Sequence, residues 1–118
     1  MVLALVDDLM FRSKIKSAAT PLGVTVTFAG SRDAALASMQ RDAPALVILD
    51  LNNPRTDPLG TVAAMKQDAA LSTIRTVGFV SHVDANTIGA ARAAGVDEVL
   101  ARSAFTMALP DLLSGAER

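Results

Sequence analysis

The chain has 118 residues, of which 51% are hydrophobic, and it carries a formal net charge of −1. This length predicts one domain over residues 1–118, with enough apolar side chains for a buried core. The absence of cysteine excludes disulfides and thiolate metal sites, and the near-zero charge, without blocks of like charge, argues against nucleic-acid and membrane partners. Because the first apolar run begins at Val2 and none approaches membrane-spanning length, we expect a cytoplasmic protein.

Strand-like and helix-like segments alternate along the whole chain. Strands are predicted over Val2–Val6, Val24–Phe28, Ala45–Leu49, Thr76–Ser81 and Glu98–Ala101. Helices are predicted over Leu9–Ala19, Arg32–Arg41, Leu59–Ala69 and Ala85–Ala94, with a last helix from Ser103 or Ala104. This alternation predicts an α/β protein of the flavodoxin-like, doubly wound class, with five parallel strands in the order 2-1-3-4-5 and helices on both faces.

Three local patterns add detail to this prediction. Val24–Phe28 alternates Val and Thr, which is typical of a half-buried or edge strand. In the third helix, the spacing of Val62, Met65 and Ala69 predicts the face that packs on the sheet. Pro110 falls inside the last helical pattern, so we expect a kink there or a helix that ends and restarts.

Polar side chains follow four of the predicted strands. They are Asp7 and Asp8 after the first, Asp50 after the third, Ser81 and His82 after the fourth, and Arg102 after the fifth. The carboxyl ends of parallel strands form the edge of the sheet where ligands bind, so we expect these side chains to converge there.

Three carboxylates in one place repel one another unless a cation joins them. Ligand sets made of oxygen atoms suit Mg²⁺, which takes one or two carboxylates and keeps several waters. We expect Asp8 and Asp50 to bind the ion directly and the backbone carbonyl of Asn52 to supply a third oxygen. Asp7 would reach the ion through water.

A divalent ion beside a carboxylate also favours phosphoryl transfer to that carboxylate, which here is Asp50. Ser81 would then donate a hydrogen bond to the arriving phosphoryl group, and Arg102 would neutralise its charge. The simpler interpretation is that Asp7 and Asp8 end a strand and cap a helix, and that Asn53 and Asp57 form turns.

Three segments carry a resemblance to a known family. They are Val6-Asp7-Asp8-Leu9-Met10-Phe11-Arg12, Asp50-Leu51-Asn52-Asn53-Pro54-Arg55-Thr56-Asp57 and Ala94-Gly95-Val96-Asp97-Glu98. In these motifs, and over its whole length, the chain resembles the receiver domain of bacterial two-component response regulators. The resemblance implies a signalling domain and not an enzyme, phosphorylated by a sensor histidine kinase or phosphotransfer protein. Its output would be contact with a downstream protein or a homodimer, through the face made by the fourth helix, fifth strand and fifth helix.

The chain also departs from the family. Arg102-Ser103 replaces a lysine and proline, Val99 replaces the switch aromatic, and His82 replaces a small residue. Arginine is planar and prefers bidentate partners, so Arg102 either serves the phosphoryl group or pairs permanently with Asp50. Without the proline, we expect a trans peptide bond before Ser103 and a reshaped loop.

Two functions therefore stay open. One is a phosphorylated stand-alone receiver, and the other is a pseudo-receiver that binds proteins independently of phosphate. A nucleotide-binding protein is disfavoured because the first strand–helix turn, Asp7 to Phe11, has no glycine to admit a phosphate chain. A metal-dependent hydrolase is disfavoured because Asp50 is followed by Leu51 and Asn52, with no general acid in the second position.

Overall fold

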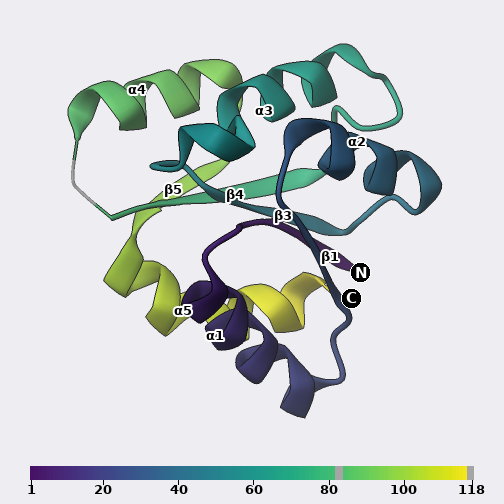
Figure 1. The fold of residues 1–118 in the computed structure, drawn as a ribbon, viewed down its shortest axis with the longest axis vertical. Helices are drawn as coiled ribbons and strands as arrows, with labels where there is room; N and C mark the ends of the chain where they lie inside the picture. The colour runs from purple at the N-terminus through teal and green to yellow at the C-terminus, as the bar shows by residue number, and fades with distance from the viewer. Residues whose placement is uncertain (82–83, 117–118) are drawn as a thin grey trace.

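The computed structural model describes residues 1–81 and 84–116, which form a five-stranded sheet in the order β2-β1-β3-β4-β5 (Figure 1). Its strands are β1 (Val2–Leu5), β2 (Val26–Ala29), β3 (Leu46–Asp50), β4 (Arg75–Val80) and β5 (Glu98–Ala101). All neighbouring strands pair in parallel. The predicted fold class and strand order are confirmed, and the alternating Val24–Phe28 segment contributes to the edge strand β2.

Helices cover both faces of this sheet. They are α1 (Leu9–Ala19), α2 (Arg32–Arg41), α3 (Pro58–Gln67), α4 (Ala85–Ala94) and α5 (Arg102–Ala116), with short 3₁₀ turns at Thr20–Leu22 and Pro54–Thr56. Figure 1 shows α1 and α5 on one face and α2, α3 and α4 on the other. Covering both faces explains why β1, and β3 as far as Leu49, are unbroken apolar runs. Within the described residues, no helix combines the length and apolar character needed to cross a membrane.

The sheet separates two core layers. On the side of α1 and α5, the rings of Phe11, Phe79 and Phe105 stack with centroids 4.5–5.8 Å apart. On the side of α2, α3 and α4, the core is aliphatic and includes Val62 and Met65, both fully buried as predicted. Burying each of these large side chains contributes roughly 1.5–3 kcal/mol, so both core layers stabilise the strands that carry the polar edge.

Two predictions about the helices need correction, and a third is narrowed. Ala69 is exposed, because α3 ends at Gln67 and Ala69 lies in the turn that follows the helix. The last helix begins at Arg102, directly after β5, and not at Ser103 or Ala104. It does not end and restart at Pro110, so of the two alternatives there the kink stays a prediction. Pro110 is exposed, so water can bond the carbonyl that its missing N–H leaves unpaired, and the helix tolerates it.

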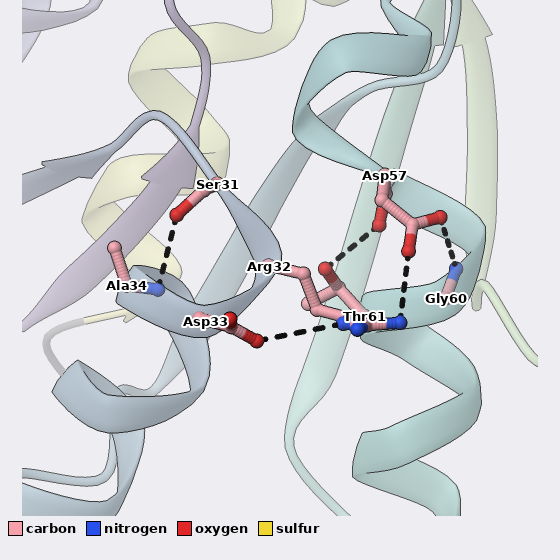
Figure 2. A network of polar contacts seen from close by, with 7 residues as sticks. All are labelled: Ser31, Arg32, Asp33, Ala34, Asp57, Gly60 and Thr61. Carbon is pink, nitrogen blue, oxygen red and sulfur yellow. Dashed lines mark hydrogen bonds and ion pairs between the residues drawn. The ribbon is translucent and has the colours of Figure 1, made fainter.

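A polar network joins the beginning of α2 to the beginning of α3 (Figure 2). Asp57 has a left-handed backbone (φ 51°), and its Oδ1 accepts a hydrogen bond from the Gly60 amide at 3.1 Å. Its Oδ2 accepts another from Arg32 at 3.1 Å, and the Thr61 hydroxyl donates to its carbonyl at 2.8 Å. Asp57 thus forms the predicted turn and also fixes the far end of the segment that follows Asp50.

Candidate functional site

Asp50 is the last residue of β3, and its side chain is half-buried at the carboxyl edge of the sheet. Burial raises the pKa of Asp50, while a 3.1 Å hydrogen bond from the Asn52 amide and the charge of Arg102 oppose the rise. The negative charges of Asp7 and Asp8 raise this pKa further. The strand ends therefore bring the predicted acidic residues and the arginine within electrostatic reach of Asp50.

The two acidic residues after β1 have different partners. Asp8 is the N-cap of α1, and its Oδ1 accepts a hydrogen bond from the Phe11 amide at 3.0 Å. Both oxygens of Asp7 are engaged, one by the side-chain amide of Asn53 and the other by Arg55 at 3.2 Å. The capping interpretation is correct for Asp8, while Asp7 is bound to the loop that follows Asp50.

Arg55 was not among the residues singled out from the sequence, and Asn53 was expected only to form a turn. Asn53 does so, because its Oδ1 accepts a hydrogen bond from the Arg55 amide at 3.0 Å. Its amide nitrogen faces Asp7 as well. A signal was present, since Asn53 and Arg55 lie in the loop directly after Asp50, next to the predicted acidic pair.

The carboxylates at this edge offer a small set of oxygen donors to the divalent ion that the sequence predicts. Residues 1–81 and 84–116 contain no group of three acidic or histidine side chains close enough to hold a metal. Mg²⁺ needs only one or two carboxylates with water, and Asp8 and Asp50 each keep one oxygen without a hydrogen bond within the described part of the chain. These two residues, with the Asn52 carbonyl, would hold the ion, and Asp7 is occupied elsewhere.

Ser81 follows β4 and is exposed at the same edge. Its backbone N–H donates to the side-chain oxygen of Asn52, which ties the ends of β3 and β4 together. Within the described ranges, the Ser81 hydroxyl has no hydrogen-bond partner and is available to a ligand. His82, which was expected beside it, lies outside the described residues.

Arg102 is the first residue of α5, and its guanidinium lies 4.6 Å from the centroid of the Phe11 ring. It makes no ion pair with Asp50 among the residues described, so the proposed permanent salt bridge is wrong, although its charge still lowers the pKa of Asp50. The peptide bond to Ser103 is trans, as expected. The predicted reshaped loop is absent, because β5 passes directly into α5.

A groove of about 640 Å³ lies beside these residues. It is lined by two cations, three hydroxyl residues and two apolar residues: Lys14, Arg102, Ser81, Ser103, Thr106, Ala101 and Met107. Positive charge with hydroxyl donors is the chemistry that recognises an anionic group such as a phosphoryl group.

Comparison with known proteins gives matches in structure. No protein-family model and no curated protein sequence matches the chain. The chemotaxis protein CheY4 of Vibrio cholerae superposes with a TM-score of 0.83 at 20% identity, over 98% of this chain and 96% of that one.

Two further structures come from related signalling proteins. The phosphorylated cyanobacterial phytochrome response regulator RcpA gives a TM-score of 0.79 at 22% identity, over 98% and 89% of the two chains. The Mn²⁺-bound form of response regulator Rcp1 gives a TM-score of 0.77 at 22% identity, over 98% of this chain and 90% of that one. With its strand order and these superpositions, the chain has the receiver fold of response regulators.

Proposed function

We propose that the chain is a single-domain receiver that accepts a phosphoryl group on Asp50 with the help of Mg²⁺ and signals through protein contacts. The observation that carries this proposal is the setting of Asp50, half-buried at a strand end and within electrostatic reach of Asp7, Asp8 and Arg102. Two structural neighbours support it, since RcpA was solved phosphorylated and Rcp1 with Mn²⁺.

The donor would be a phosphohistidine on a sensor histidine kinase or a phosphotransfer protein. An oxygen of Asp50 attacks the phosphorus atom, the phosphorus–nitrogen bond breaks, and its electron pair leaves with the imidazole. Mg²⁺, when bound, neutralises charge between the carboxylates and the phosphoryl oxygens.

Ser81 and Arg102 would hold the transferred group. The Ser81 hydroxyl donates a hydrogen bond to a phosphoryl oxygen, and the guanidinium of Arg102 leaves the Phe11 ring to pair with another. Because Arg102 begins α5, its movement would be passed to that helix directly. Val99, in the place of the family's switch aromatic, is half-buried in β5 and has no ring to rotate.

The output would be contact with a downstream protein or a second copy through the face of α4, β5 and α5. Of the apolar residues in α5, Leu109, Leu112 and Leu113 are in the core, while Met107 is 84% exposed. The sequence left open whether these side chains are core or surface. Met107 is the large apolar side chain that α5 offers to a partner.

A pseudo-receiver is the second candidate. It is favoured by the stacking of Arg102 on Phe11 and by the engagement of Asp7 with Arg55, since both occupy groups that phosphorylation would use. In this case the same surface would bind a protein partner whether or not phosphate is present.

Amide NMR spectra with Mg²⁺ and then beryllofluoride, which mimics an aspartyl phosphate, separate the two candidates. A working receiver shows shifts at Asp8, Asp50, Ser81 and Arg102 that extend into α5, and the Asp50→Asn control shows none with beryllofluoride. Treatment with a small phosphodonor should add the mass of one phosphoryl group to the wild type alone. An unchanged spectrum and mass would rule out phosphorylation and leave the pseudo-receiver.

A further inference from the structure

We infer that Arg55 and Asn53 form a latch on Asp7 that weakens the binding of a divalent cation by the neighbouring carboxylates of Asp8 and Asp50. The inference rests on the proposed function, because it concerns the ion that this function requires. It adds a regulatory contact within the chain, in which the guanidinium of Arg55 places a positive charge beside Asp7.

The first arm of the latch is the side-chain amide of Asn53. The Asn53 oxygen accepts a hydrogen bond from the Arg55 backbone amide at 3.0 Å, which leaves the amide nitrogen directed to Asp7. The Asn53 carbonyl accepts a further hydrogen bond from the Thr56 hydroxyl at 3.1 Å, and Thr56 is fully buried. Asn53 is therefore held in position by its own turn before it meets Asp7.

The second arm is the guanidinium of Arg55, 3.2 Å from the other oxygen of Asp7. The Arg55 side chain is 79% exposed, whereas that of Asp7 is only 25% exposed. An ion pair with so exposed a partner is weak and opens readily. It can therefore yield to a divalent ion, and does not close the site permanently.

The latch opposes the ion in two ways. It occupies both oxygens of Asp7, which the ion's water would otherwise contact. The guanidinium also neutralises the charge of Asp7 and repels a divalent cation nearby. Both effects weaken divalent binding, so the chain should bind Mg²⁺ more weakly than it would without Arg55.

Titration with Mn²⁺, followed by the paramagnetic broadening of amide signals, measures this competition directly. We expect Arg55→Ala to lower the Mn²⁺ dissociation constant by roughly three- to tenfold at low salt, with broadening centred on Asp8 and Asp50. The gain should shrink as salt is added, because screening weakens the guanidinium's repulsion. Arg55→Lys, which keeps the charge and loses the fork, should give a smaller gain.

The matched control is Arg75→Ala. Arg75 also pairs with one carboxylate, Glu98 at 3.5 Å, but it lies at the first residue of β4, on the opposite edge of the sheet. Arg75→Ala removes the same charge as Arg55→Ala but far from the carboxylates at the carboxyl edge. The Mn²⁺ dissociation constant of this variant should therefore stay within about twofold of the wild-type value. Equal gains in Arg55→Ala and Arg75→Ala would reduce the effect to net charge and overturn the latch.

The remaining outcomes separate the latch from the proposed function. Wild type and Arg55→Ala that bind Mn²⁺ equally well would overturn the latch and leave the metal site intact. No binding by either protein would overturn the latch and the metal-dependent function together. Tighter binding by Arg55→Ala without any response to beryllofluoride would uphold the latch and reject phosphorylation.

Discussion

Replacing Phe11 by leucine should uncouple Arg102 from the core. Phe11 stacks on Phe79 at 4.5 Å and on Phe105 at 5.8 Å, and each aromatic pair contributes roughly 0.5–1.5 kcal/mol. The guanidinium of Arg102 over the same ring adds about 0.5–1 kcal/mol. Because leucine still fills much of the space, we expect Phe11→Leu to lower the free energy of unfolding by about 2–3 kcal/mol.

A double-mutant cycle with Arg102→Gln isolates the cationic part of this loss. Lys14 also lies 5.9 Å from the centroid of the Phe11 ring, so the single variant would mix two cations. From urea unfolding of the wild type, both single variants and the double variant, the coupling energy between Phe11 and Arg102 should be about 0.5–1 kcal/mol.

Phe105→Leu provides the matched cycle. Phe105 is equally buried and stacks on both other rings, at 5.8 and 4.8 Å, but no described cation lies over it. Its coupling with Arg102→Gln should stay within about 0.3 kcal/mol of zero. A coupling that small in the Phe11 cycle, or equal couplings in both cycles, would refute the stacking of Arg102 as an energetic link.

Two further predictions concern stability. A methyl group at Gly60 would lie 2.2 Å from the Asp57 carboxylate, so Gly60→Ala should displace this helix cap and lower the free energy of unfolding by about 1–2 kcal/mol. Gly89 has open space around it, so Gly89→Ala should be neutral or stabilising. Urea unfolding measures both variants, and equal effects would contradict this prediction. Burial raises the pKa of Asp50 above 3.8 in the folded chain, so this carboxyl ionises at a lower pH in the unfolded chain than in the folded one. The wild type should therefore lose stability relative to Asp50→Asn as the pH rises from about 3 to about 7 in metal-free buffer. Thermal unfolding that shows the opposite trend would refute it.

Most of the fold could be predicted because its periodic patterns agree with its packing. Leu9–Ala19, Arg32–Arg41 and Ala85–Ala94 have the bounds that their periodicity predicts. Asp8, Ser31 and Asp84 cap these helices through their side chains, which marks their first turns clearly in the sequence. Local and tertiary preferences coincide in these helices, so the sequence was sufficient to predict their bounds.

The start of α5 and the partners of the site could not be predicted in this way. Whether Pro110 breaks a helix depends on which side faces water, and this follows only from how α5 packs. The contact of Arg55 with Asp7 joins residues 48 positions apart and has no periodic signal. Arg102 likewise meets Phe11 and not Asp50, because the helix that it begins directs it over the ring.

All four phenylalanines adjoin the same core layer, on the side of α1 and α5, and the chain has no tryptophan or tyrosine. Their ring currents therefore disperse the methyl signals of that layer, while those of the aliphatic layer under α2, α3 and α4 depend on packing alone. A methyl NMR spectrum of this protein would then sort its signals by face of the sheet. An event at the carboxyl edge could be followed into each half of the molecule separately, without an introduced label.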